Sequence, residues 1–357
     1  MAYTTIDDPS AHFQTAIWTG NNVNNRAITN DGNSDLQPDF IWLKDRNVGF
    51  GYRLTDSTRG ITKNLASETT GAESTSTTQY ASWNTDGFTL IYGGQQVPNY
   101  NGNTYVAWQW KANGGTTTAF NESGSNPGGT RQTNTDAGFS IISYTGTGSN
   151  GTIAHGLPST PEFLIFKRRD ATQFWCVWQQ ALGDDYKLAL QSTDALDSDG
   201  AFMNSTLPTS TNITVGGASV NTNADNGTYI CYAFSPVQGY SKFGKYVGNA
   251  NANGPFVYTG FKPAWVMVKG ITSNGYHWTI WDSKRNPHNE VKERINANSG
   301  DAAYAGTSGN DYVDFLSNGF KLRSTRSASN VANITYIYMA FAENPFTTST
   351  GIPTTAR

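Results

Sequence analysis

The chain has 357 residues, of which 14% are charged, and its formal net charge at neutral pH is −3. So few charged residues exclude a coiled coil or a long solvated helix, and the acidic balance disfavours nucleic acid as a partner. The 37 glycines and the 13% aromatic residues, together with many Thr and Asn, are typical of an all-β protein with tight turns.

Three markers recur in the same order along the chain. The first is an aromatic residue closely followed by Gly, the second is a Pro before a short apolar run ending in Lys, and the third is a Tyr opening a β-branched and aromatic run. They stand at Trp18, Pro38 and Tyr105, at Tyr144, Pro161 and Tyr229, and at Tyr246, Pro263 and Tyr336. The second and third markers lie 67, 68 and 73 residues apart, which predicts three tandem units.

The predicted units are all-β. The runs FIWLK, FLIFK and WVMVK are short, apolar and bounded by turn residues, as buried strands are. Asn-Gly and Asp-Gly pairs punctuate the chain and suit hairpin turns. We therefore expect three β-sandwiches of about 100 residues, jelly-roll or lectin-like, each burying one face of two sheets. The most helix-like segment is 289–295.

The composition also predicts the boundaries of these parts. The segment 114–137 is rich in Gly, Thr and Asn, with one aromatic residue, and is expected to be a flexible linker. Units 2 and 3 follow each other directly and should pack as a rigid pair. The expected parts are an N-terminal arm (1–11), unit 1 (12–113), the linker (114–137), unit 2 (138–236), unit 3 (237–346) and a C-terminal tail (347–357).

No complete catalytic or metal-binding constellation is visible in the sequence. The four histidines have no metal-ligand spacing, and Cys176 and Cys231 are expected to be free packed thiols. Gly146–Gly151 fits G-x-G-x-x-G, but two prolines and an extended run follow it, which indicates a hairpin instead of a dinucleotide site. We therefore expect no enzymatic activity, no metal and no cofactor.

Two recurrent features have both a structural and a functional interpretation. Asp56 and Asp282 each precede an Arg by three residues at matching places in units 1 and 3, where unit 2 has Gln179 and Gln180. A structural ion pair is the simpler interpretation of such Asp–Arg pairs. The tryptophans fall in repeat strands, which indicates core packing, although exposed ones would provide a platform for sugar rings.

Unit 3 contains the candidate binding residues. Its residues 239–346 hold seven Lys and four Arg against four Asp and three Glu, a net charge of +4. Most of this excess comes from Lys284, Arg285, Lys292, Arg294, Lys321, Arg323 and Arg326. The extra length of unit 3 falls in the polar stretch 283–312, and loops on a rigid scaffold commonly carry binding residues. The candidates are Lys284, Arg285, Asn286, His288 and Asn289; the alternatives are a solvated loop or a subunit contact.

Several long segments resemble a recurrent type of virion or tail-fibre-like protein in tailed phages that infect marine bacteria, including cyanophages. These segments are DSTRGITKNL at 56–65, DGFTL at 86–90, TYVAWQWKANGG at 104–115, the runs 138–170 and 239–269, DFLSNGFKLRST at 314–325 and TYIYMAFAENPF at 335–346. The resemblance covers nearly the whole chain and brings no catalytic residue with it.

This resemblance implies a non-catalytic virion protein assembled in the host cytoplasm, which agrees with the lack of a visible secretory signal. The leading expectation is a tail-associated fibre or adhesin that contacts the host surface. The alternative is a capsid fibre, a decoration protein or another purely structural part. Expected partners are other virion proteins through unit 1, a host-surface glycan, and further copies of the chain in a homo-oligomer, with a trimer favoured. No nucleic acid and no membrane insertion are expected.

Overall fold

Antiparallel strands and tight turns build the part of the chain that the structure describes. The computed structural model describes residues 2–94, 98–305, 312–325 and 328–354. Strands account for 42% of the chain and helical residues for 3%, so the predicted all-β class is confirmed. The helical residues of the described ranges lie in three 3-10 turns, η1 (Pro9–Ala11), η2 (Gln180–Leu182) and η3 (Gly200–Phe202).

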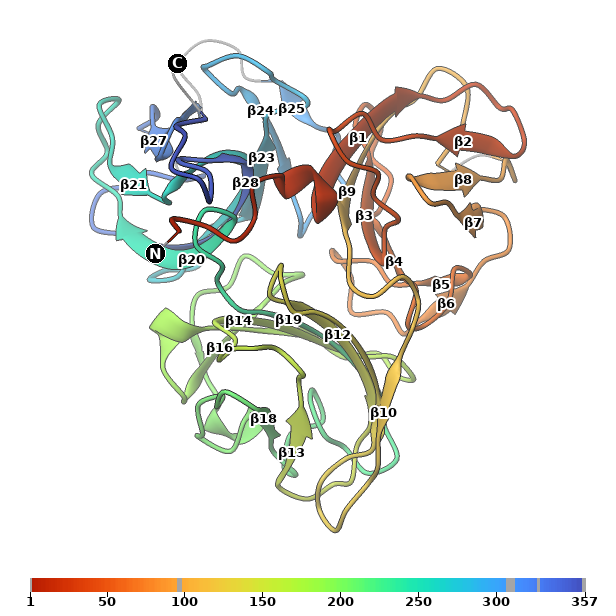
Figure 1. Ribbon diagram of the computed structural model, residues 1–357. Helices are drawn as coiled ribbons and strands as arrows, with labels where there is room; N and C mark the ends of the chain where they lie inside the picture. Colours follow the sequence, from red (N-terminus) through yellow and green to blue (C-terminus); the bar gives the residue numbers. More distant parts are fainter. Residues whose placement is uncertain (1, 95–97, 306–311, 326–327, 355–357) are drawn as a thin grey trace.

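The strands form three groups in chain order, for which the names unit 1, unit 2 and unit 3 are kept (Figure 1). Unit 1 contains β1 (Phe13–Thr19), β2 (Arg26–Ile28), β3 (Phe40–Asp45), β4 (Arg53–Asp56), β5 (Lys63–Asn64), β6 (Ser74–Thr75), β7 (Tyr80–Trp83), β8 (Phe88–Leu90) and β9 (Thr104–Trp110). Unit 2 and the segment before it contain β10 (Thr118–Phe120), β11 (Gly129–Asn134), β12 (Phe139–Thr145), β13 (Gly151–Ala154), β14 (Phe163–Arg168), β15 (Trp175–Gln179), β16 (Tyr186–Ala189), β17 (Asp197–Ser198), β18 (Asn212–Val215) and β19 (Thr228–Phe234). Unit 3 contains β20 (Ser241–Val247), β21 (Phe256–Tyr258), β22 (Phe261–Gly270), β23 (Trp278–Asp282), β24 (Glu293–Asn296), β25 (Tyr304–Ala305), β26 (Val313–Leu316), β27 (Gly319–Leu322) and β28 (Thr335–Pro345).

The larger sheets of the three units share one strand order. The order is β1-β9-β3-β4 in unit 1, β12-β19-β14-β15 within the larger sheet of unit 2, and β20-β28-β22-β23 in unit 3. A smaller sheet faces each of them: β2-β8-β7, β13-β18 and β21-β27-β26. Separate hydrophobic clusters bring together residues of the larger and smaller sheet in each unit. Each unit is therefore two-layered.

The marker strands are buried on both faces. In β3, Phe40 and Trp42 point away from the small sheet into a central cluster, whereas Ile41 and Leu43 pack inside unit 1. The strands β14 and β22 divide their side chains in the same way. Because successive side chains of a strand point to opposite faces, burial of both faces requires a continuous apolar run. This is why FIWLK, FLIFK and WVMVK contain no alternation.

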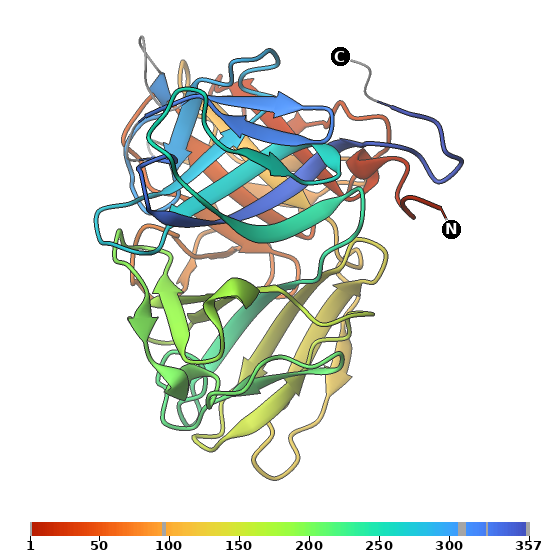
Figure 2. The same cartoon turned by 90° about the vertical axis from the view of Figure 1, so that its left-hand side faces the viewer.

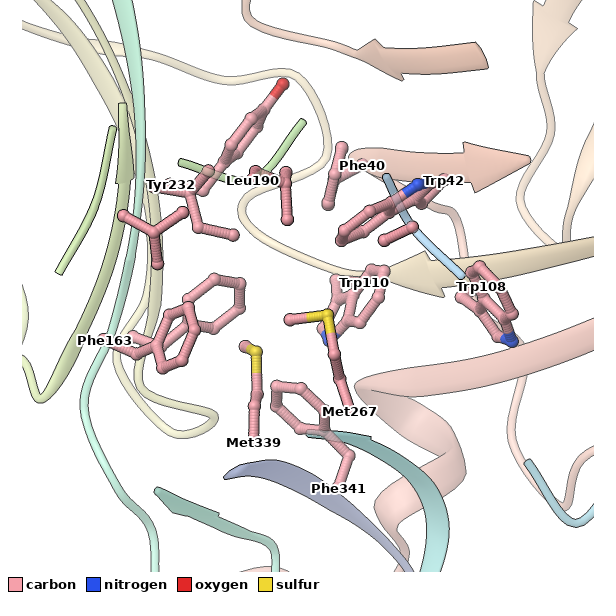
Figure 3. Close-up of a cluster of buried hydrophobic side chains, with 14 of the residues drawn as sticks. Phe40, Trp42, Trp108, Trp110, Phe163, Leu190, Tyr232, Met267, Met339 and Phe341 are labelled. Atoms are coloured by element: carbon pink, nitrogen blue, oxygen red, sulfur yellow. The ribbon is translucent and has the colours of Figure 1, made fainter. Parts of the chain in front are cut away.

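The outward faces of the three larger sheets meet in one central core (Figures 1 and 3). The Phe40 ring of unit 1 stacks on Tyr232 of unit 2, with the ring centroids 4.3 Å apart. Phe341 of unit 3 contacts Phe234 of unit 2 at 5.8 Å and Trp110 of unit 1 at 5.6 Å. Units 2 and 3 are thus no separate rigid pair, since unit 1 shares the same core with both of them.

Hydrogen bonds repeat around this core in a cyclic order. Each comes from an aromatic residue opposite the marker lysine and reaches a carbonyl of the neighbouring unit. They are Tyr52 Oη to Asn296 O at 2.8 Å, Trp175 Nε1 to Ala66 O at 2.9 Å and Trp278 Nε1 to Ala189 O at 2.9 Å. Unit 1 thus donates to unit 3, unit 2 to unit 1, and unit 3 to unit 2.

The marker lysines strengthen the same cycle. Lys44 donates to Gly300 O of unit 3, Lys167 to Thr70 O of unit 1, and Lys269 to Thr193 O of unit 2, at 2.9, 3.1 and 3.2 Å. Each ammonium also donates to a carbonyl of its own unit. Burial lowers the pKa of all three lysines to about 8, so most of each population is still protonated at neutral pH.

The segment 114–137 is not the flexible linker that its composition predicts. It forms β10 and β11, which extend the larger sheet of unit 2 beside β12. Gln132 in β11 is buried; its amide nitrogen donates to Ser57 and Thr58, and its oxygen accepts from the Gly115 amide. Specific hydrogen bonds of its polar side chains thus hold this segment in place. The amino-acid composition of the segment does not reveal these partners.

The expected helix at 289–295 and the expected arm at 1–11 also differ from the structure. Residues 289–292 are extended or bent, and β24 begins at Glu293. The first residues are docked on unit 3, where the Tyr3 hydroxyl donates to Gly260 O at 2.6 Å. Asp7 accepts hydrogen bonds from the backbone and hydroxyl of Ser349, so the N-terminal segment and the C-terminal tail hold each other. Both leave the body on the same side in Figure 2.

Candidate functional site

A cavity lies at one edge of unit 3. It has a volume of about 520 Å³ and is enclosed by the β23–β24 loop, the β26–β27 turn, the ends of β22 and β28, and the C-terminal tail. We call it the rim cavity. Its lining residues are Lys262, Ser283, Asn286, Pro287, His288, Asn289, Val291, Phe315, Leu316, Ser317, Glu343, Asn344 and Thr354.

Three of the five predicted binding residues line this cavity. Asn286, His288 and Asn289 belong to the lining, whereas Lys284 and Arg285 do not. The Lys284 ammonium instead pairs with Asp31 of unit 1, so this residue joins two units.

Arg285 is part of the interior. Its Nε lies 2.6 Å from Asp282 Oδ2, and both side chains are fully buried. Its guanidinium also lies 5.8 Å from the ring centre of Trp108. The prediction that Arg285 contacts a partner is wrong, because its ion pair with Asp282, three residues earlier, holds the Arg285 side chain in the interior.

Two asparagines give the loop its shape. Asn289 mimics a strand partner, because its amide donates to Phe315 O and its oxygen accepts from the Phe315 amide, both at 2.9 Å. Asn286 Oδ1 accepts from the backbone amides of Lys292 and Glu293 at 2.9 and 2.6 Å. Side chains of this type commonly replace backbone partners in turns. His288 lies between them and is exposed.

An ion pair forms another wall of the cavity. Lys262 Nζ lies 2.5 Å from Glu343 Oε1, across the adjacent strands β22 and β28. These residues are 81 positions apart in the chain, so no local pattern in the sequence points to their meeting. The charges of Lys262 and Glu343, both in the lining, balance each other. Amides, hydroxyls and an imidazole beside Phe315 and Leu316 suit a neutral polar ligand better than an anion.

Carboxylates of the chain pair with several of the cationic side chains of unit 3. Besides Lys262, Lys284 and Arg285, Arg323 pairs with Asp314 at 2.5 Å, and Lys292 lies 3.8 Å from Glu290. Arg326 lies outside the described residues. Four of the seven cations behind the expected contact surface for an anionic partner, Lys284, Arg285, Lys292 and Arg323, thus have a carboxylate of the chain beside them.

The tryptophans belong to the core. Nine of the ten are buried, and Trp83 is half-buried, so none provides an exposed platform for a sugar ring. Cys176 and Cys231 are free and buried, as expected. Gly146–Gly151 forms the turn between β12 and β13 and opens no helix.

Metal and membrane signatures were sought in the same residues. No group of three or more His, Cys, Asp or Glu in the described ranges could hold a metal ion. Nor does any helix within those ranges have the length and apolarity to cross a membrane.

Residues 8–345 match a family described as "Domain of unknown function (DUF7483)". The chain belongs to this family. The DUF7483 match begins just before η1 and ends with β28, so it takes in the shared core, all three units and nearly the whole rim cavity. No curated protein matches the chain. The extent of the family match supports treating the three units as one structural body.

Proposed function

We propose that this protein is a non-catalytic virion component of a tailed phage, a tail-associated adhesin that binds a host-surface saccharide in the rim cavity. The virion assignment rests on the resemblance of the segments quoted above. The observation that supports binding is the cavity of about 520 Å³, whose lining combines neutral polar groups with the apolar Phe315 and Leu316. Saccharides present hydroxyls and apolar ring faces together, which such a lining complements.

The cavity walls are held in place by the fold. Asn286 and Asn289 are fixed through backbone partners, and Lys262 and Glu343 fix each other. A site that is already ordered loses little conformational entropy when it binds a ligand. The Glu343 carboxylate is occupied by Lys262, so it is poorly placed to act as a general base on a bound ligand.

A capsid decoration protein is the second candidate. The shared core and the cyclic hydrogen bonds favour it, because they join the three units into one body and remove the hinge that would give a fibre its reach. A rigid body of this kind is well suited to sit on a capsid shell. The two candidates differ in position on the particle and in the need for a ligand.

Cell binding tests the adhesin proposal. Fluorescently labelled full-length protein should bind host cells and should block adsorption of the phage. His288→Ala should weaken binding by about tenfold, since an exposed side chain in the cavity is lost without disturbing the fold. Lys245→Ala, an exposed residue on β20 outside the cavity, is the matched control and should bind as the unmodified protein does. Equal binding by both variants would remove the rim cavity from the proposal.

A further inference from the structure

A second pocket lies where unit 2 meets unit 3. It has a volume of about 290 Å³, and its walls are β15, β16, β17, the loop after β16, and Asn274 of unit 3. We call it the corner pocket. Its volume is at the lower end of the range for small-molecule sites, about 300–1,000 Å³, which suits a ligand the size of one sugar ring.

Contacts between the two units keep the corner pocket open in one shape. Asn274 Oδ1 accepts from the Ala195 amide at 2.7 Å, and the Leu196 amide donates to Ile271 O at 3.1 Å. Lys187 Nζ lies 2.5 Å from Asp197 and 2.6 Å from Asp199, which fixes the opposite wall. The pocket is thus preformed. Because unit 3 supplies part of its wall, the pocket exists only when units 2 and 3 are packed together.

An exposed aromatic ring stands at its edge. Phe174 is 54% exposed, although the next residue, Trp175, is completely buried. The fold does not need an aromatic residue here, because Gly51 precedes the equivalent Tyr52 in unit 1. A flat apolar ring at the mouth of a polar pocket is the usual stacking surface for the apolar face of a sugar.

The polar groups of the pocket complement hydroxyls. Gln191 and Asn274 use their side-chain oxygens on backbone amides, so their NH2 groups are available to donate. Among the described residues, none donates a hydrogen bond to the Asp194 carboxylate, so it is available to accept one. With Lys187 opposed by Asp194 and Asp197, the lining has a net charge of −1, which disfavours an anionic ligand.

The equivalent corners of the other two units have diverged. In unit 1 the cavity has about 260 Å³ and is lined by Arg53 and Gln79, with no ring at the place of Phe174. In unit 3 the Tyr304 ring, at the place of Asp197, lies against the Arg294 guanidinium, 4.6 Å away. The combination of ring, amides and carboxylate belongs to unit 2.

We propose that the corner pocket is a binding site for a neutral sugar residue, stacked on Phe174 and hydrogen-bonded by Asp194, Gln191 and Asn274. It lies apart from the rim cavity and does not depend on the role proposed for that cavity.

The test uses the purified full-length chain and the methyl glycosides of glucose, galactose, mannose, N-acetylglucosamine and glucuronic acid. Saturation-transfer NMR should detect at least one neutral glycoside, and calorimetry should give an affinity that Phe174→Ala lowers about tenfold and Asp194→Asn lowers measurably. The glucuronide should bind more weakly than glucoside. Phe256→Ala, which removes an aromatic ring of similar exposure on unit 3, is the control and should change nothing.

Each other outcome is decisive. If no neutral glycoside binds, or if the glucuronide binds best, the proposal is overturned. If a glycoside binds and His288→Ala abolishes binding while Phe174→Ala does not, the sugar occupies the rim cavity, and the corner-pocket proposal fails while the proposed function stands. If Phe174→Ala weakens glycoside binding and His288→Ala does not, the corner-pocket proposal is supported. The rim cavity is then tested only by the cell-binding experiment.

Discussion

At the residue scale, the Asp–Arg pairs acquire partners that the sequence does not reveal. Tyr232 donates to Asp56 at 2.7 Å, and Trp108 donates to Asp282 at 3.0 Å, each from the neighbouring unit. The equivalent residue of unit 3 is Met339, which has no donor, and unit 2 has Gln179 in place of Asp. A unit therefore has the buried Asp only where the neighbouring unit supplies a hydrogen-bond donor to it. This explains why the Asp–Arg pair is missing from one unit.

We predict that Tyr232→Phe destabilises the protein by about 1–2 kcal/mol, because it leaves the buried Asp56 and Arg59 without one partner. Urea unfolding monitored by fluorescence measures the change. Tyr186→Phe is the control, since Tyr186 is exposed at the surface of unit 2. Identical unfolding curves for both variants would show that the hydroxyl contributes nothing.

Glu73 links units 1 and 2 in a pH-dependent way. It accepts from Arg169 at 2.9 Å and from Arg59 at 3.1 Å. Burial alone would raise the pKa of Glu73, but the hydrogen bond from Arg169 and the charges of both arginines outweigh it and lower the pKa below its ordinary value of 4.5. Its contribution to stability is therefore complete above that value and is lost as the pH falls through the lowered pKa.

We predict that Glu73→Gln is less stable than the unmodified protein at pH 7 by about 1.5–3 kcal/mol, the worth of hydrogen bonds to charged groups. The difference should shrink as the pH falls below 4.5, because the carboxylate then protonates in the unfolded chain and, at the lowered pKa, in the folded protein as well. Thermal unfolding at a series of pH values measures it. A difference that stays constant from pH 7 to pH 3 contradicts the assignment.

At the element scale, the sequence predicts best those strands that are buried on both faces. The marker runs in β3, β14 and β22 are continuous and apolar because each faces two cores. The polar strand β11 cannot be recognised from the sequence, since Gln132 has its side-chain partners Ser57 and Thr58 in unit 1. The place of Arg285 is also hidden, because its guanidinium lies beside Trp108, which is far away in the sequence.

The ordering of β10 and β11 has a direct consequence for proteolysis. Arg131 lies in β11, paired with Ile142 of β12, so the native backbone there cannot enter a protease active site without local unfolding. We predict that trypsin leaves the chain uncut at Arg131 under native conditions and cuts it there in Gln132→Ala more readily. Heat-denatured protein is the positive control. Rapid cleavage after Arg131 in the native protein would contradict this account and support a flexible linker at 114–137.

At the scale of the whole molecule, the faces through which three sandwiches could associate are already used within one chain. Phe40, Tyr232 and Phe341 meet in the central core, and the marker lysines link the units around it. The homo-oligomer expected from the sequence would therefore have to use other surfaces. The rim cavity is built by distant segments of unit 3 and the C-terminal tail, whereas the corner pocket needs units 2 and 3 together. The arrangement of the units therefore decides what the corner pocket can bind.

The measurement that tests the proposed function most directly is the position of the protein on the particle. Antibodies against the full-length chain, bound to intact phage and viewed by electron microscopy with gold labelling, should mark the tail. Label over the capsid shell would contradict the adhesin and support the decoration protein. Particles that carry no label, while the same antibodies detect the free chain, would contradict a virion role altogether.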